Sequence, residues 1–399
     1  MALTQVPPAL LTSTTGTGST VVLSASPTFT GTVTTPGVTF SDASSQTAAA
    51  SPFVLKNRII NGNMVIDQRN AGASLTITAA FPPAYTMDRF WAYGSVTSKF
   101  SVQQNAGSVT PPAGFTNYLG CTSLSAYSVG SSENFLFGQY IEGFNVADLD
   151  FGKATAKTIT LSFWVRSSLT GTFGGSFINS ASNRSYVFSY TISAANTWEQ
   201  KSITVAGDTS GTWLTNNGVG LAVNFSIGSG STFSTTAGSW VTGNFLNATG
   251  ATSVVGTNGA TFYITGVQLE IGSTATPFER RLYNQELANC QRYFWILTSD
   301  AGNTTPFNAV WFNSKIRMAM ICPVMMRSTP TVTTSGTLAN FFFATNDDAA
   351  YSNFTISSTY SEQNRSTTTV GFTGTSSGAS GGAQMYIQNS RSFNVSAEL

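Results

Sequence analysis

Paired carboxylates are the residues whose spacing could most readily support chemistry in this chain. Asp148 and Asp150 lie two positions apart, and Asp347 is followed directly by Asp348. Glycoside hydrolysis needs two carboxyl groups about 5 to 10 Å apart. Neighbouring residues on a strand point to opposite faces, which argues against Asp347 with Asp348. Either pair could hold Ca²⁺ only with help from other oxygen ligands.

Histidine and cysteine add no reactive arrangement. The sequence has no histidine, the commonest general base and metal ligand. Cys121, Cys290 and Cys322 are odd in number and far apart, which suits neither a disulfide framework nor a zinc site. We expect them to be small buried side chains. The sequence therefore predicts no catalytic residue, no metal and no cofactor, and the chain is not expected to be an enzyme.

The composition narrows the class of protein. Hydrophobic residues make up 41% of the 399 residues and aromatic residues 12%, so sizeable cores can form. Charged residues make up only 9%, far below the roughly 25% of ordinary soluble domains, and the formal net charge is +1. No basic run is present to attract nucleic acid. No apolar stretch approaches the roughly 20 residues of a membrane helix, and no secretory signal is visible. We predict neither nucleic-acid binding nor membrane insertion.

Residues 1–52 form a block of their own, rich in Thr, Ser, Gly, Pro and Val, with Asp42 as the sole ionisable side chain. β-branched residues favour extended backbone, and Gly and Pro interrupt it every few residues. Such a segment cannot close a core alone. It is either a disordered linker or an extended segment that intertwines with other chains, and the second interpretation is preferred here.

The rest of the sequence predicts an all-β protein with one helix. Period-two strands, for example over 159–165, 186–192 and 221–227, indicate a two-sheet sandwich over 53–278, which we expect to be a jelly roll. A phase slip at Thr265–Gly266 predicts a β-bulge. Apolar residues at helical spacing (Tyr283, Leu287, Cys290 and Phe294) predict a linking helix over 279–296. Short strands over 297–399 predict a smaller C-terminal β domain.

Several segments resemble one family, and residues 57–69 and 266–294 look like the two ends of its module. In order along the chain, the sequence is similar to appendage proteins of tailed bacteriophages, such as tail fibres, at 26–42, 57–69, 85–91, 161–168, 266–294, 323–332 and 396–399. The resemblance implies a homotrimeric virion subunit that is made in the host bacterial cytoplasm, held by other virion proteins through residues 1–52, and presents β domains outward. It also implies a carbohydrate-binding-like jelly roll that binds host cell-surface glycan.

Three tryptophans are the candidate glycan-binding residues under that resemblance. Sugar sites use aromatic faces beside amide side chains. Trp213 and Trp240 lie in turn-like segments near asparagines, and Trp164 shares a strand face with Arg166. The competing interpretation is that each tryptophan packs in the core or between subunits.

The charged residues of the family motifs have a structural interpretation. Asp67, Arg69, Asp88, Arg89, Glu270, Glu279, Arg280 and Arg281 are a large share of a scarce set of charges. Half-buried Arg–carboxylate pairs would join the ends of the domain without catalysis, and Glu279 is expected in the first turn of the helix. A short tail fibre is the function predicted here. The alternatives are a head fibre or capsid decoration protein, a glycan-degrading tailspike and a bacterial adhesin.

Overall fold

A computed structural model describes the chain in part. The described residues are 38–39, 45–46, 56–79, 82–298, 305–312, 315–334, 341–345, 350–351, 354–360, 367–374, 381–387 and 392–399. The chain divides into two compact units, residues 1–54 and 55–399. In the first unit, β1 (Val38–Thr39) pairs antiparallel with β2 (Ser45–Gln46). The remainder of the expected anchoring segment lies outside the described residues.

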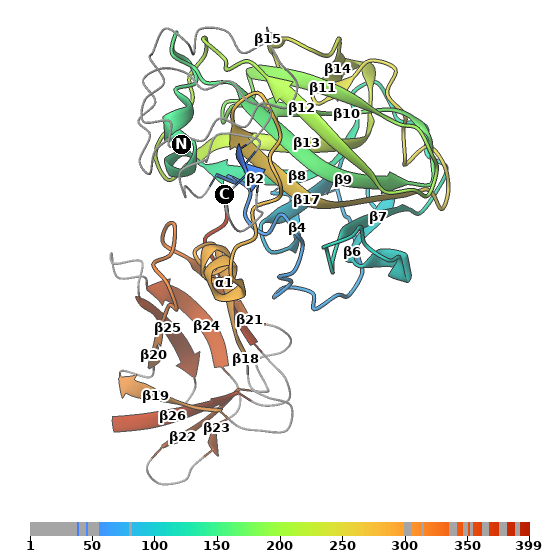
Figure 1. The fold of residues 1–399 in the computed structure, drawn as a ribbon. Helices are drawn as coiled ribbons and strands as arrows, with labels where there is room; N and C mark the ends of the chain where they lie inside the picture. The colour runs from blue at the N-terminus through green and yellow to red at the C-terminus, as the bar shows by residue number, and fades with distance from the viewer. Residues whose placement is uncertain are drawn as a thin grey trace, which may run out of the picture. The chain divides into compact units, whose positions relative to one another are not determined.

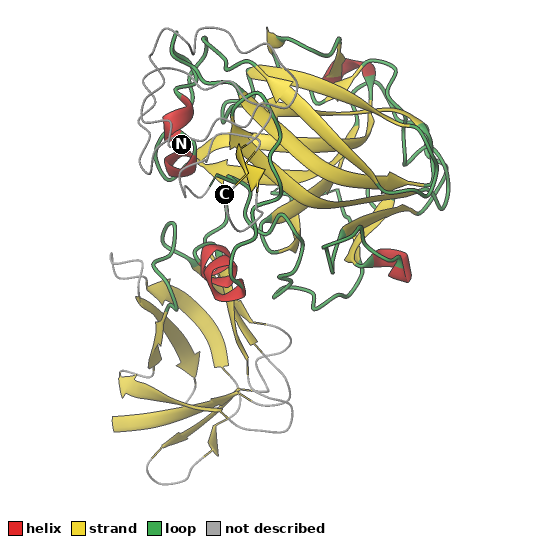
Figure 2. Ribbon diagram, viewed as in Figure 1, coloured by secondary structure: helices red, strands yellow, loops and turns green. Residues whose placement is uncertain are grey.

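Two antiparallel sheets form a sandwich in the second unit (Figures 1 and 2). The seven-stranded sheet runs in the order β15 (Trp240–Thr242), β11 (Arg184–Ile192), β10 (Gly171–Ile178), β13 (Val219–Ser229), β8 (Asn134–Glu142), β5 (Phe90–Gly94) and β4 (Ala84–Met87). The six-stranded sheet runs in the order β12 (Glu199–Val205), β9 (Ile159–Ser167), β17 (Thr261–Ile271), β7 (Leu119–Ser123), β6 (Phe100–Gln104) and β3 (Leu75–Thr76). From β8 to β13 the chain crosses repeatedly between the sheets.

The core lies between these sheets, where the alternating residues point. Along β9, every second residue from Ile159 to Val165 is fully buried, and the same alternation fills the core from β8, β13 and β17. The predicted slip is confirmed, because the β17–β9 register shifts between Thr265 and Gln268, and Gly266 has a positive φ of 63°. A β-bulge at a glycine restores the inward phase for the rest of the strand.

Short strands and single-turn helices lie in the loops of the sandwich. β14 (Ser234–Thr235) and β16 (Asn247–Ala248) pair in parallel. Single-turn 3₁₀ helices occur at Ala106–Ser108, Gly143–Asn145, Ala147–Leu149 and Ser231–Phe233. No helix among the described residues has the length and apolar character needed to span a bilayer.

The linking helix is shorter than the sequence indicated. α1 comprises Tyr283–Gln291, whereas we expected a helix over 279–296. Residues 279–281 precede the helix, and Glu279 and Arg281 bind the backbone of residues 56–59. The prediction that Glu279 lies in the first turn of the helix is therefore wrong. Phe294 already belongs to β18 (Phe294–Thr298). Of the expected apolar stripe, Cys290 is buried, but Tyr283 is 59% exposed.

Two further sheets follow α1. The three-stranded sheet has the order β18, β27 (Ser392–Ser396) and β21 (Thr331–Thr334). The second seven-stranded sheet has the order β23 (Ala350–Tyr351), β22 (Phe341–Thr345), β26 (Gly381–Ile387), β19 (Thr305–Phe312), β20 (Lys315–Ile321), β25 (Thr367–Gly374) and β24 (Phe354–Tyr360). The all-β architecture, with one α-helix among the described residues, is therefore confirmed.

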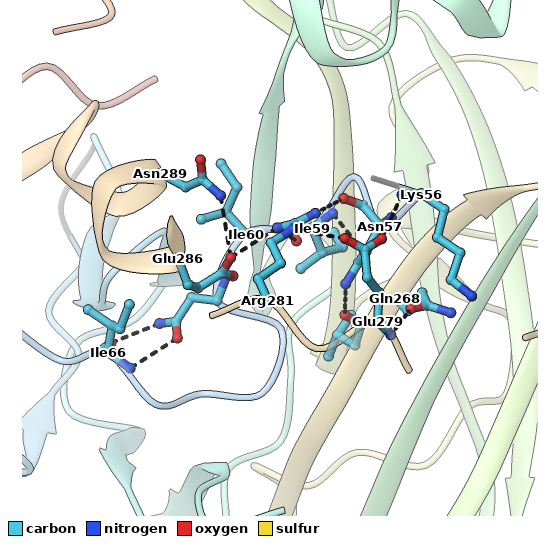
Figure 3. A network of polar contacts seen from close by, with 12 residues as sticks. Lys56, Asn57, Ile59, Ile60, Ile66, Gln268, Glu279, Arg281, Glu286 and Asn289 are labelled. Carbon is cyan, nitrogen blue, oxygen red and sulfur yellow. Dashed lines mark hydrogen bonds and ion pairs between the residues drawn. The ribbon is translucent and has the colours of Figure 1, made fainter. Parts of the chain in front are cut away.

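A polar network joins residues 56–66 to β17 and to the segment after it (Figure 3). The Leu269 N–H donates to Asn57 Oδ1 at 3.0 Å, and Asn57 Nδ2 donates to the Val267 carbonyl at 3.1 Å. The backbone N–H groups of Lys56 and Asn57 both donate to Glu279 Oε2. Residues 57–69 and 266–294 are therefore neighbours in space, as their pairing in the sequence implied.

Arg281 extends this network to the helix. It pairs with Glu279 at 3.2 Å and with Glu286 at 3.1 Å, and it also donates to the Asn57 and Ile59 carbonyls. Glu286 in turn accepts from the Asn61 N–H. Residues 279–281 make these contacts outside the helix, and the N-cap residue Leu282 has an extended backbone (φ −60°, ψ 144°), so α1 starts later than expected.

The motif charges therefore hold the domain together, although not always as Arg–carboxylate pairs. Arg69 and Arg89 both pair with Glu398, a partner that we did not anticipate. Asp88 accepts instead from the Gln68 backbone N–H and side-chain amide. Glu270 accepts from Thr276, Asp67 from Asn70 and Gly72, and Arg280 stacks on Phe115 and Phe278.

Candidate functional site

A hollow lies on the outward face of the seven-stranded sandwich sheet, and the alternation of the strands builds it. In β5, Phe90 and Ala92 point into the core, so Trp91 and Tyr93 point outward. In β8 the outward residues include Leu136 and Tyr140, and those of β13 include Ala222 and Asn224.

The hollow has a volume of about 510 Å³, within the range of roughly 300 to 1,000 Å³ typical of ligand pockets. Its walls come from the segment before β4, the turn after β10, the segment between β13 and β16, and the end of the chain. The residues that line it are Pro82, Pro83, Trp91, Tyr93, Asn134, Leu136, Tyr140, Ile178, Asn179, Ser180, Ser182, Val219, Ala222, Asn224, Phe233, Asn244, Leu246 and Leu399.

An aromatic pair forms part of the floor. The rings of Trp91 and Tyr140 stack with centroids 4.9 Å apart and planes 29° apart. Gly138 is the register partner of Trp91 and of Asn224, so a residue without a side chain separates them. A Cβ at Gly138 would lie 3.1 Å from Trp91 Cζ2 and would collide with the Val223 carbonyl oxygen. The glycine therefore gives the indole room to lie flat in the hollow.

Polar groups beside the aromatic floor are left without partners. Asn224 Nδ2 donates to Ser176 Oγ at 3.1 Å, but Asn224 Oδ1 accepts no hydrogen bond from any described residue. Trp91 Nε1 likewise finds no acceptor among the described residues. Both side chains are only 3% exposed. Seven other buried side-chain atoms among the described residues also lack partners, but only Trp91 and Asn224 line the hollow, where a ligand could pair the free donor and the free acceptor.

Tyr140 supplies a phenol that stays protonated. Burial raises the pKa of Tyr140 to about 12, so the hydroxyl can both donate and accept at neutral pH. Asn179, at the turn after β10, already has hydrogen-bond partners, because its Oδ1 accepts from the Asn183 and Arg184 N–H groups. The hollow thus combines apolar ring faces with a few fixed hydrogen-bonding groups.

Trp213 and Trp240, two of the tryptophans selected from the sequence, lie together elsewhere. Their rings are 5.4 Å apart and nearly perpendicular, and Phe151 contacts both edge-on. Trp213 Nε1 donates to the Ser210 carbonyl and Trp240 Nε1 to the Ala206 carbonyl. Both are half-buried, pack against the core, and have no unpaired indole N–H to offer a ligand.

Trp164, the third tryptophan selected from the sequence, lies on the other sheet. It is half-buried in β9 and pairs across the ladder with Thr265 and Gln200. A Cβ at Gly266 would lie 3.2 Å from its Cδ1, so the indole packs over the β-bulge. The structure therefore brings Trp213 and Trp240 together and leaves Trp164 apart from them.

Asp148 and Asp150, the aspartate pair within the described residues, form ion pairs with basic side chains. Asp148 pairs with Arg58 at 2.6 Å, and Asp150 pairs with Lys153 at 2.7 Å. The hydrogen bond from Lys153 lowers the pKa of Asp150, whereas a general acid needs a raised pKa. Asp347 and Asp348 lie outside the described residues. No group of three or more acidic, cysteine or histidine residues in the described ranges is arranged to hold a metal ion.

Trp91, the central residue of the hollow, was missed as a site residue, although a signal was present. It ends the segment Tyr85–Trp91, which the sequence links only to the family resemblance. The alternation Phe90, Trp91, Ala92, Tyr93 places two aromatic side chains on one strand face. Its register with Gly138 and Asn224 comes from strand pairing between distant segments, which the local pattern does not reveal.

Comparisons with known proteins give only remote likenesses. No family model matches the chain, and no curated protein matches it. Among solved structures, the enzymatically active domain of tailspike protein 4 from bacteriophage CBA120 aligns at 13% identity and a TM-score of 0.28. The alignment covers 54% of this chain and 21% of the tailspike chain.

Carbohydrate-binding modules align over a similar share of the chain. The family 11 module from Clostridium thermocellum, in complex with a mixed-linked tetrasaccharide, aligns at 12% identity and a TM-score of 0.25. That alignment covers 50% of this chain and 97% of the module. TmCBM61, in complex with β-1,4-galactotriose, aligns at 10% identity and a TM-score of 0.25, covering 49% and 99%.

Proposed function

We propose that this chain is a non-enzymatic, glycan-binding subunit of a bacteriophage virion, and that the hollow on the seven-stranded sheet is its glycan site. The observation that carries the proposal is the stacked Trp91–Tyr140 pair with the unpaired Trp91 Nε1 and Asn224 Oδ1 beside it. Aromatic faces pack against the apolar face of a pyranose, and its hydroxyl groups satisfy the free donor and acceptor.

A glycan array followed by titration tests this site. Hot-spot tryptophans contribute about 2 kcal/mol or more to binding, so Trp91→Ala should weaken the selected glycan by roughly 30-fold or more. Trp198→Ala is the control for the loss of an indole elsewhere, because Trp198 is half-buried beside the six-stranded sheet, where it contacts Tyr118, and does not line the hollow. Equal binding by wild type and Trp91→Ala would reject the hollow as the site.

The virion context rests on the sequence. The ordered series of motifs resembles phage appendage proteins, and the network around Asn57, Glu279 and Arg281 gives two of those motifs a shared structural role. In this proposal the chain is a short tail fibre used in host adsorption. Immunogold labelling of intact particles would test the location: label at the tail supports a tail fibre, and label on the capsid supports a head fibre or decoration protein.

We further propose that the subunit is a homotrimer anchored to other virion proteins by residues 1–52. The support is compositional, since this segment is almost uncharged and has too little apolar area to form its own core. Native mass spectrometry of the full chain should show three copies. A stable monomer at micromolar concentration would contradict the trimer.

A further inference from the structure

The absence of charge among the described residues that line the hollow is informative about its ligand. None of their side chains is acidic or basic. Two arginines that adjoin lining residues are already paired with carboxylates. Arg89, which donates to the Tyr140 carbonyl, pairs with Glu398. Arg184, which follows the turn after β10, makes two hydrogen bonds to Asp208, at 2.6 and 2.8 Å.

The unpaired acceptor gives a second, independent indication. Asn224 Oδ1 can only accept a hydrogen bond, and Asn224 Nδ2 already donates to Ser176. A carboxylate, sulfate or phosphate group is also only an acceptor, so it cannot satisfy Asn224 Oδ1. A sugar hydroxyl can donate to this atom, and another hydroxyl can accept from Trp91 Nε1.

We propose, resting on the function proposed above, that the hollow selects an uncharged, hydroxyl-rich glycan and discriminates against anionic ones. An anionic group of the glycan in the hollow would lose its hydration shell without gaining a basic side chain as partner. An unpaired buried charge is strongly unfavourable. Trp91 and Asn224 are separated by one strand, so they are about 10 Å apart, and a glycan that reaches both must extend across β8.

The test is an array that carries neutral oligosaccharides beside carboxylated counterparts of the same length. Galactose oligomers, galacturonate oligomers and methyl-esterified galacturonate oligomers form one such set, because the ester removes the charge and keeps the backbone. Every hit is repeated with Trp91→Ala to confirm that binding is in the hollow. We expect each Trp91-dependent neutral glycan to bind at least about tenfold more tightly than its carboxylated counterpart.

A variant that adds a positive charge at the hollow tests the same preference in the opposite direction. Asn244 is exposed at the rim of the hollow, so Asn244→Lys should narrow or reverse the preference for the neutral member of a pair by about tenfold. Asn258→Lys is the control, because Asn258 is equally exposed but does not line the hollow. No change in the preference with Asn244→Lys would count against the proposal.

The outcomes separate the two proposals. Carboxylated glycans that bind as tightly as neutral ones, with Trp91 dependence, would overturn the selectivity and leave glycan binding intact. Binding of no glycan on the array would overturn both. Binding that does not depend on Trp91 would reject the hollow as the site, and with it this inference.

Discussion

Removing the carboxylate of Glu398 should destabilise the protein more than removing any exposed acidic partner. Glu398 pairs with Arg69 at 2.6 Å and with Arg89, whose side chain is 1% exposed, while Glu398 itself is 7% exposed. Arg89 Cζ lies 3.6 Å from the centre of the Tyr293 ring, so the guanidinium has little access to water. The Glu398→Ala change therefore leaves a buried cation without its counter-charge.

The size of the effect follows from the burial. Breaking a buried ion pair by removing one partner costs about 3 to 5 kcal/mol, whereas exposed pairs contribute about 0 to 1 kcal/mol. The matched control is Asp148→Ala, because Asp148 is 48% exposed and pairs with Arg58 at the same 2.6 Å. We expect a difference of about 3 kcal/mol between the two variants. The double variant Arg89→Ala/Glu398→Ala should lose less than the sum of the single variants.

The assay needs both a global and a local readout. Urea unfolding followed by tryptophan fluorescence gives the free energy of unfolding. Hydrogen exchange at the Ala397 amide, which donates to the Tyr293 carbonyl at 2.7 Å, reports local opening of the segment that carries Glu398. If Glu398→Ala and Asp148→Ala have equal stability, and Ala397 exchanges no faster, the buried-pair reasoning is refuted.

Three further predictions concern protonation, packing and the alternative sites. Burial raises the pKa of Asp88 from 3.8 to about 6, so the folded state binds this proton more tightly than the unfolded state, and stability should fall by about 2 kcal/mol as pH rises from 4 to 6. Asp88→Asn should flatten that part of the curve in urea titrations at successive pH values, and an unchanged slope would contradict the assignment. Gly138→Ala should displace the Trp91 ring and weaken glycan binding by about tenfold or more, measured by calorimetry; unchanged affinity would mean that the ring position is unimportant. Trp213→Ala and Trp240→Ala should leave host adsorption unchanged in a phage adsorption assay, because neither residue lines the hollow and both indole N–H groups are already paired; weaker adsorption by either variant, with the protein still folded, would favour the sequence-based candidates instead.

The architecture could be predicted largely from local patterns. The alternation over 159–165 and 221–227 identified buried strands correctly, and the phase slip at Thr265–Gly266 identified the bulge. Both signals come from the two-residue period of a strand, which is readable in a single segment. The sequence overestimated the helix at its start because Glu279 and Arg281 bind the backbone of residues 56–59, and at its end because Phe294 belongs to β18.

The residues of the candidate site could not be grouped from the sequence, because strand pairing between distant segments brings them together. Trp91, Gly138 and Asn224 come from three strands, and only the β5–β8–β13 register places them side by side. The sequence favours Trp213 and Trp240 as glycan contacts because they lie in turn-like segments near asparagines. In the structure their indole N–H groups bind nearby carbonyls, which leaves them packed against the core.

The crystal structure of the protein with the tightest-binding neutral oligosaccharide tests the central claim most directly. The account predicts a sugar ring against the Trp91–Tyr140 pair, with one hydroxyl donating to Asn224 Oδ1 and another accepting from Trp91 Nε1. A sugar bound at Trp213 and Trp240 or over Trp164, with the hollow empty, would contradict it.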